Sequence, residues 1–301
     1  MRQEVAVQEH ASEELHAAGA EGELTMEELP EWISDHIGDG GYIEFAGGHW
    51  DLAALAFDPI RLGPVVINLS PTRQFVVMLL VAVLLALVFV PVARTIRKRG
   101  IERAPGGFAG AMEAVILYFR DEVVRPNIGH GADGFTPFIL TIFFFVLGMN
   151  VIGLTPLGIT PTANLSVTAA LAVISFAVTE ISGFRALGPA GYARTIFFLP
   201  AGLPLFMRPI MLAILAPVEF LGKLAKPFAL AVRLLANMTA GHLLILSLIG
   251  MIFIVRTYLM GVASVTMASG LMVFELFVAF LQAYIFAMLT AVFIGLIRHA
   301  H

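Results

Sequence analysis

The chain has 301 residues, of which 58% are hydrophobic and 13% charged, and its mean hydropathy is +0.88. This composition excludes an ordinary soluble globular domain and is typical of a polytopic membrane protein. The sequence contains no cysteine, which excludes disulfides and thiolate metal sites. The formal net charge of −4 is unevenly distributed, because the first 60 residues hold 14 of the 22 acidic residues and only one basic residue, Arg2.

The acidic stretch at residues 1–70 predicts an N-terminal extension beside a membrane domain at residues 71–301. It lacks the basic start and short apolar core of a secretory signal and the arginine-rich character of a transit peptide. These features favour a bacterial plasma (inner) membrane protein. The histidines of the extension are too widely spaced to suggest a metal site, and we expect none: His10, His16, His36 and His49.

The first membrane span is predicted at residues 75–93, a nearly uninterrupted run of Val, Leu and Ala that is long enough to cross the hydrocarbon. The basic sequence RTIRKRGIER follows at once. By the positive-inside rule this loop is cytoplasmic, so the acidic extension is predicted to lie outside.

Four further segments follow in the first two thirds of the chain. Residues 108–124 mix apolar and charged positions at helical spacing and predict an amphipathic interfacial helix. Residues 138–157 and 164–181 predict the second and third spans. Residues 184–205 are rich in Gly and Pro and predict a cytoplasmic loop.

The sequence LTPLGITPTANLS joins the second and third spans, and its two prolines and several hydroxyl groups are typical of irregular backbone near a membrane surface. At membrane depth such backbone is tolerated only when it is buried in protein or lines a wet cavity. Asn164 and Ser166 are therefore candidates for facing water, and helix capping by Asn164 is the open alternative.

The last two apolar segments, residues 207–258 and 262–297, are each much longer than the roughly 20 residues that a vertical span needs. They predict two long, strongly tilted helices, or helices broken into shorter spans. Together with the earlier segments they predict an all-α polytopic membrane protein with about five membrane helices and one interfacial helix. The alternation of spans places the C-terminus in the cytoplasm.

Arg233 lies inside the first of these long segments, where a permanent charge is unexpected. A guanidinium keeps its proton in a protein, and at the bilayer centre it costs roughly 2.5–3.5 kcal/mol even on lenient insertion scales. Asn237 follows at i+4 and shares the face of Arg233, Glu219 falls about 40° away, and His242 points to nearly the opposite side. An ionisable residue in this position indicates a function.

The last segment carries Glu275 and Gln282, which are seven residues apart and therefore lie on one face of a helix. This second polar stripe is positioned to pair with the stripe around Arg233. Each polar residue also has a structural alternative, which the residues alone leave open.

Three structural alternatives concern the charged residues. Lys223 and Lys226 have long stems that reach an interface, Glu219 and Lys223 have the i,i+4 spacing of an ion pair, and His242 fits a neutral core histidine. Gln282 fits a helix–helix contact, a frequent use of amides in membranes.

The run KPFALAVRLLANMTAGHLL resembles the signature of the a subunit of rotary F-type ATP synthases, the proton-channel stator beside the c-ring. In that family an invariant arginine is followed by an Asn-Met pair and an Ala-Gly pair, and the matching positions here are Arg233, Asn237, Met238, Ala240 and Gly241. The run FLQAYIFAMLTAVFIGL resembles the last helix of the family, with Gln282 at its glutamine.

The resemblance extends over about residues 75–297. Glu219 stands 14 residues before the arginine, as in the family, and His242 and Glu275 occupy two positions that hold a histidine and a glutamate in either order across its members. Asn164 departs from the aspartate that some bacterial members have at this place, which argues against a charged role there.

The resemblance implies two offset aqueous half-channels and an essential arginine that faces the c-ring carboxylate, so that proton flow drives ring rotation and ATP synthesis. The implied protein is not catalytic by itself and needs no cofactor. Its implied partners are the c-ring, the peripheral-stalk b subunits, the other ATP synthase subunits and the lipid bilayer, with no nucleic acid. The proton-path candidates are Glu219, Asn237, His242, Glu275 and Gln282, followed by Asn164, Ser166 and Lys223.

The main alternative is a secondary transporter that binds an anionic solute through Arg233. Against it, the sequence has no internal repeat and no matching pair of Gly/Pro-broken helices. A membrane-embedded enzyme is disfavoured because no metal-binding or nucleophile motif is present. The coupling ion, H⁺ or Na⁺, stays open because the partner carboxylate site largely decides it.

Overall fold

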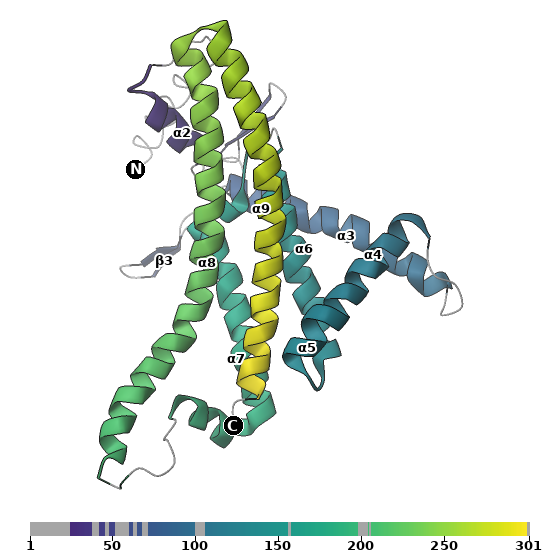
Figure 1. Ribbon diagram of the computed structural model, residues 1–301, viewed down its shortest axis with the longest axis vertical. Coiled ribbons are helices and arrows are strands. Elements are labelled where there is room, and N and C mark those ends of the chain that lie inside the picture. The colour runs from purple at the N-terminus through teal and green to yellow at the C-terminus, as the bar shows by residue number, and fades with distance from the viewer. Residues whose placement is uncertain are drawn as a thin grey trace. The chain divides into compact units, whose positions relative to one another are not determined.

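The computed structural model describes residues 25–37, 42–45, 48–51, 60–62, 65–67, 72–99, 106–155, 158–197, 204 and 206–299. Within these residues, five helices are long and apolar enough to cross a membrane by length and composition. They are labelled in Figure 1: α3 (Arg73–Arg99), α6 (Thr136–Gly153), α7 (Leu165–Ile196), α8 (Arg208–Val255) and α9 (Tyr258–Arg298). The prediction of an all-α polytopic membrane protein is confirmed.

The two predicted long helices are present as α8 and α9, with 48 and 41 residues. Pro217 and Pro227 lie inside α8, yet the helix continues through both. Proline removes one backbone hydrogen bond and kinks or breaks a helix, but it does not end the helix at either position here. The alternative of shorter, separate spans is therefore wrong for α8.

The loop predicted at residues 184–205 is wrong for its first half, because α7 continues to Ile196. The continuation is not smooth. Gly188 has φ 70° and ψ 173°, a conformation that glycine adopts without strain, and Pro189 begins the next helical stretch. The Gly-Pro signal thus marks a break within a helical segment and not a loop.

The N-terminal part contains short elements that the sequence did not suggest. Helix α2 (Leu29–Ile37) is followed by two antiparallel hairpins, β1 (Tyr42–Phe45) with β2 (Gly48–Asp51) and β3 (Ile60–Leu62) with β4 (Val65–Ile67). Trp32 and Ile33 of α2 are buried and pack against Leu246 and Phe253 of α8. This apolar contact attaches α2 to the second half of α8.

The chain divides into two compact units. The first unit comprises Met1–Val83, Leu147–Asn164 and Leu235–Phe280, and the second comprises Leu84–Val146, Leu165–Leu234 and Leu281–His301. The division passes through α8 and α9, so each long helix contributes one part to each unit.

In the second unit, the predicted interfacial helix is a chain of short elements. These are α4 (Gly107–Tyr118), η2 (Phe119–Val124), α5 (Arg125–Ile128) and η3 (Ala132–Phe135). Phe119 is buried, and its ring packs against Phe143 of α6 and Tyr284 of α9. This contact fixes the π-helical turn η2 to the membrane helices.

The polar side of this region is a surface network. Arg125 binds the carboxylates of Asp121 and Asp133, each at 2.8 Å. The guanidinium of Arg120, which donates to Asp121 at 2.9 Å, lowers the pKa of that carboxyl. These residues form ion pairs with one another on a solvent-exposed face.

Candidate functional site

Arg233 lies in the part of α8 that belongs to the second unit, and its side chain is exposed. Its neighbours Leu230 and Leu234 are buried, with 3% and 1% exposure. The helix therefore turns its leucines inward and its guanidinium outward. Among the described residues, that guanidinium has no hydrogen-bond or ion-pair partner.

Gln282 of α9 is buried, with 5% exposure, and its Nε2 donates to the backbone oxygen of Arg233 at 3.5 Å. The amide thus contacts the backbone of the arginine and not its charge. The predicted helix–helix contact by Gln282 is present, and it joins α9 to α8 at the level of Arg233.

His242 and Glu275 meet in the first unit, in the second half of α8 and the first half of α9. His242 Nδ1 lies 3.5 Å from Glu275 Oε1, and the two residues are only 9% and 4% exposed. Thr160 approaches the other ring nitrogen, with 3.0 Å between its Oγ1 and His242 Nε2. The three side chains form a continuous polar line, named here the His242 cluster.

The close approach of Glu275 depends on Gly241. A Cβ at this position would lie 2.3 Å from Glu275 Oε1, well inside van der Waals contact. Any larger residue would displace the carboxylate from His242. The Gly241 of the sequence motif therefore has a local steric role.

A buried amide supports the loop that carries Thr160. Thr162 donates to Asn150 Oδ1 at 2.6 Å, and Asn150 Nδ2 donates to the backbone oxygen of Ala279 at 3.3 Å. Asn150 is fully buried. We did not predict a role for Thr160, Thr162 or Asn150 from the sequence. Two signals could have indicated them: the irregular backbone that carries the threonines, and the lone amide in an apolar span.

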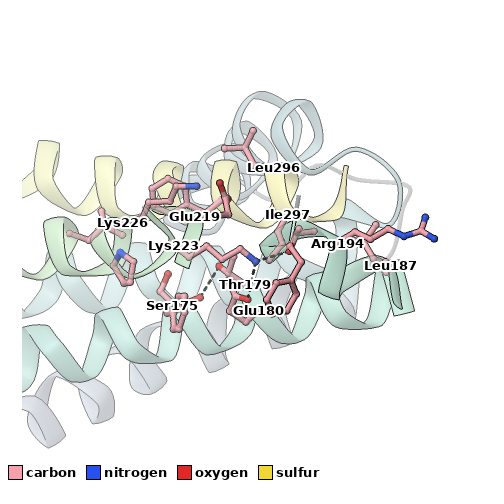
Figure 2. A pocket seen from close by; sticks show the side chains of 18 residues that line it. Ser175, Thr179, Glu180, Leu187, Arg194, Glu219, Lys223, Lys226, Leu296 and Ile297 are labelled. Atoms are coloured by element: carbon pink, nitrogen blue, oxygen red, sulfur yellow. Dashed lines mark hydrogen bonds and ion pairs between the residues drawn. The ribbon is translucent and has the colours of Figure 1, made fainter. Parts of the chain in front are cut away.

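A pocket of about 940 Å³ lies in the second unit, lined by α7, the first half of α8 and the end of α9. Figure 2 shows the side chains of Glu180 and Lys223 close together at its wall, with Glu219 and Lys226 on α8. Lys223 Nζ is 3.8 Å from Glu180 Oε2 and donates to Thr195 Oγ1 at 2.8 Å. Its ammonium also lies 4.7 Å from the centroid of the Tyr192 ring.

The ion pair of Lys223 differs from the pair that its spacing predicts. Glu219 was the expected i,i+4 partner, but the recorded partner is Glu180 on α7. Glu219 is exposed in the pocket wall, whereas Lys223 bends toward the carboxylate and the Thr195 hydroxyl. Glu180 was therefore missed, because only the packing of α7 on α8 reveals its partner.

The remaining candidates are spread out. Asn237 is exposed on α8, and Lys226 lies 5.5 Å from the centroid of the Phe293 ring. Asn164 directly precedes α7 with φ −102° and ψ 128°, the extended backbone of a helix N-cap position, and Ser166 is exposed in the first turn.

Metal binding has no candidate in the described residues, which contain no group of three or more His, Cys, Asp or Glu that could hold an ion. Of the four scattered histidines, His10 and His16 lie outside the described residues. His36 and His49 fall in α2 and β2.

Comparison with known proteins assigns the family. Residues 75–295 match the family described as ATP synthase A chain. "ATP synthase subunit a" of Anaeromyxobacter dehalogenans (strain 2CP-C) is 41% identical over 98% of this chain and 78% of its own length. The protein of the same name from Chloroherpeton thalassium is 44% identical over 76% of this chain and 67% of its own. "ATP synthase subunit a 2" of Chlorobaculum tepidum is 40% identical over 93% and 77%. With a match over most of its length, the chain belongs to the ATP synthase subunit a family.

Proposed function

We propose that this protein is the proton-translocating stator subunit of an ATP synthase, with Arg233 facing the carboxylate of a c-ring. The observation that carries the proposal is the exposed guanidinium in the middle of an apolar 48-residue helix. A fixed cation in this position needs a countercharge at membrane depth. The described chain supplies none to it, so the partner carboxylate comes from another subunit.

The chemistry of arginine suits this role. Its guanidinium stays protonated and presents five donors, which stabilise a deprotonated carboxylate as it passes. A permanent positive charge also repels a mobile proton, so it keeps two aqueous paths from joining. Each proton that moves down the membrane potential supplies about 2.3 kcal/mol per 100 mV.

Two polar regions, one on each side of Arg233 along α8, support two half-channels. His242 is nine residues after the arginine and Lys223 ten residues before it in the sequence of α8. The positive-inside rule assigns the Lys223 side to the cytoplasm and the His242 side to the outside. We assign the outer half-channel to the His242 cluster and the inner half-channel to the pocket.

The His242 cluster is suited to proton transfer because imidazole gains and loses a proton near neutral pH. Glu275 is in direct reach of one ring nitrogen and Thr160 of the other. Gln282 holds the backbone at Arg233, and Asn237 lies one turn further along the same helix.

The proposed function also implies a membrane location, an orientation and partners. The protein spans a bacterial inner membrane with its N-terminus outside and its C-terminus in the cytoplasm, and it joins the c-ring and the peripheral-stalk b subunits. It contributes ion translocation to the complex and no catalysis of its own.

Substitution of Arg233 tests the proposal. In membrane vesicles that contain the assembled complex, Arg233→Ala is expected to abolish proton-driven ATP synthesis, and Arg233→Lys is expected to fail as well, because an ammonium at membrane depth can lose its proton. Arg185→Ala, at an exposed position of α7, is the matched control and should synthesise ATP normally. Unimpaired synthesis by Arg233→Ala would overturn the stator role. Purification as an autonomous anionic-solute transporter without a ring would favour the alternative.

A further inference from the structure

Glu180 is a charged residue deep in α7 that the preceding mechanism does not use. Its side chain is 18% exposed and that of Lys223 is 10% exposed, so the pair is largely removed from solvent. Both residues lie in segments that are long and apolar enough to span the membrane. A carboxylate in this setting is costly unless it is paired.

The pairing leaves the carboxylate incompletely occupied. Tyr192 donates a hydrogen bond to Glu180 Oε2. Lys223 Nζ lies 3.8 Å from the same oxygen and donates a hydrogen bond to Thr195 instead. An ionised carboxylate accepts up to about four hydrogen bonds. The remaining acceptor sites of Glu180 lie at the wall of the pocket.

The pocket is large and polar enough for water. At about 30 Å³ per molecule, 940 Å³ corresponds to roughly thirty waters. Ser175 and Thr179 precede Glu180 on the same wall, and Ser175 is 2.8 Å from Thr290 of α9. A row of hydroxyl groups therefore leads along α7 to the carboxylate. The other charged side chains that line the pocket are Arg194, Glu219 and Lys226.

We propose that Glu180 is an additional proton-carrying residue of this pocket, and that Lys223 and Tyr192 are positioning residues for it. The ionised carboxylate takes a proton from water in the pocket, becomes a neutral acid, and gives that proton to water on the cytoplasmic side. Lys223 keeps its proton throughout and supplies the countercharge that the ionised form needs. This assignment rests on the proposed stator function and deepens it.

A structural ion pair and a proton carrier respond differently to paired substitution. Replacing both partners of a buried ion pair by apolar residues of similar volume is often neutral for folding, whereas removing one partner is destabilising. If Glu180 only holds α7 to α8, the double variant Glu180→Leu with Lys223→Met should work. If Glu180 carries protons, that variant should assemble and still be slow.

The test measures proton-driven ATP synthesis and ATP-driven proton pumping in vesicles, each divided by the amount of assembled complex. Glu180→Gln and the double variant are both expected to lose about tenfold of each rate, a smaller effect than the roughly hundredfold or more that is typical of a positioned acid–base group. Glu180→Asp keeps the carboxylate and is expected to retain more than half. Glu122→Gln, an exposed carboxylate of η2, is the matched control.

The outcomes separate the two proposals. A double variant with wild-type rates overturns the role of Glu180, and so does a Glu180→Asp variant as slow as Glu180→Gln. If Glu180→Gln does not assemble, the charge-neutral double variant decides alone. Arg233→Ala is measured in parallel: ATP synthesis by that variant refutes the stator function, whatever Glu180 does, whereas its failure beside a fully active double variant refutes only the proposal for Glu180.

Discussion

The two polar regions of this protein accommodate polar side chains among apolar helices in different ways. In the His242 cluster the polar side chains lie close together and away from solvent. Glu275 is only 4% exposed, and its carboxylate, 3.5 Å from His242 Nδ1, has no hydrogen-bond partner among the described residues. In the pocket the charged groups of α7 and α8 line an open space of about 940 Å³. A polar group in a membrane is costly without a protein partner or water. The cluster relies on the close approach of His242 and Glu275, whereas the pocket has room for water.

The difference predicts different sensitivities. The His242 cluster should be intolerant of changes in shape, because its side chains are buried and lie close together. The pocket should tolerate small changes in shape. The rate of ATP synthesis should fall mainly when the lost charged group makes a contact that water cannot replace.

Within these two regions, the largest effect is expected for Glu275→Gln. This change removes the ionisable partner of His242 from a buried site and should lower proton-driven ATP synthesis by roughly a hundredfold, in the range for a positioned acid–base group. The measurement is the synthesis rate per assembled complex in vesicles. A loss of less than threefold would contradict the role of the cluster and leave Glu275 a structural residue.

The next effect concerns shape alone. Gly241→Ala adds one methyl group that would lie 2.3 Å from Glu275 Oε1, and the displaced carboxylate should reduce synthesis by about tenfold. Gly270→Ala is the matched control, because a Cβ there meets no atom within 4 Å. Equal rates for the two alanine variants would show that the cluster is not rigid.

A smaller effect is expected for the hydroxyl beside His242. Thr160→Val keeps the volume but removes the Oγ1 that lies 3.0 Å from His242 Nε2. A net hydrogen bond contributes roughly 1 kcal/mol, so the synthesis rate should fall by about fivefold. Thr160→Ser keeps the hydroxyl and should restore most of the rate; failure of this rescue would argue that the methyl group matters instead.

The smallest effect is expected in the pocket. Glu219 is exposed there, and bridging water is nearly as good a partner as a direct hydrogen bond. Glu219→Gln should therefore lower synthesis by no more than about threefold. A loss as large as that of Glu275→Gln, measured under the same conditions, would remove the distinction between the two regions.

Local sequence signals were sufficient to predict the membrane helices, which the structure confirms, and to select Arg233, whose role stays a prediction. Long apolar runs predict spans regardless of packing, and a lone guanidinium in such a run is visible without a structure. The bounds were less accurate where glycine and proline were involved: the helical segment breaks at Gly188, resumes at Pro189 and ends only at Ile196.

The contacts that complete the site could not be predicted, because they join residues far apart in the chain. Thr160 and His242 are 82 positions apart, and Glu180 and Lys223 lie on different helices. The spacing rule paired Lys223 with Glu219, since a helix pattern reports only neighbours on the same helix. The hairpins β1–β2 and β3–β4 were missed for a similar reason, as strands of three or four residues carry too few positions for a periodic pattern.

The contact between Gln282 and Arg233 involves the backbone of the arginine and leaves its guanidinium free of that contact. The Gln282 amide donates a hydrogen bond to the backbone oxygen of Arg233, which holds the backbone at this residue. The four rotatable bonds of the arginine side chain still allow the guanidinium to change its position. In the proposed stator role, one arginine would then serve successive carboxylates of a turning ring without any movement of α8. Loss of Gln282 should accordingly alter the timing of each step, whereas loss of Arg233 removes the step itself.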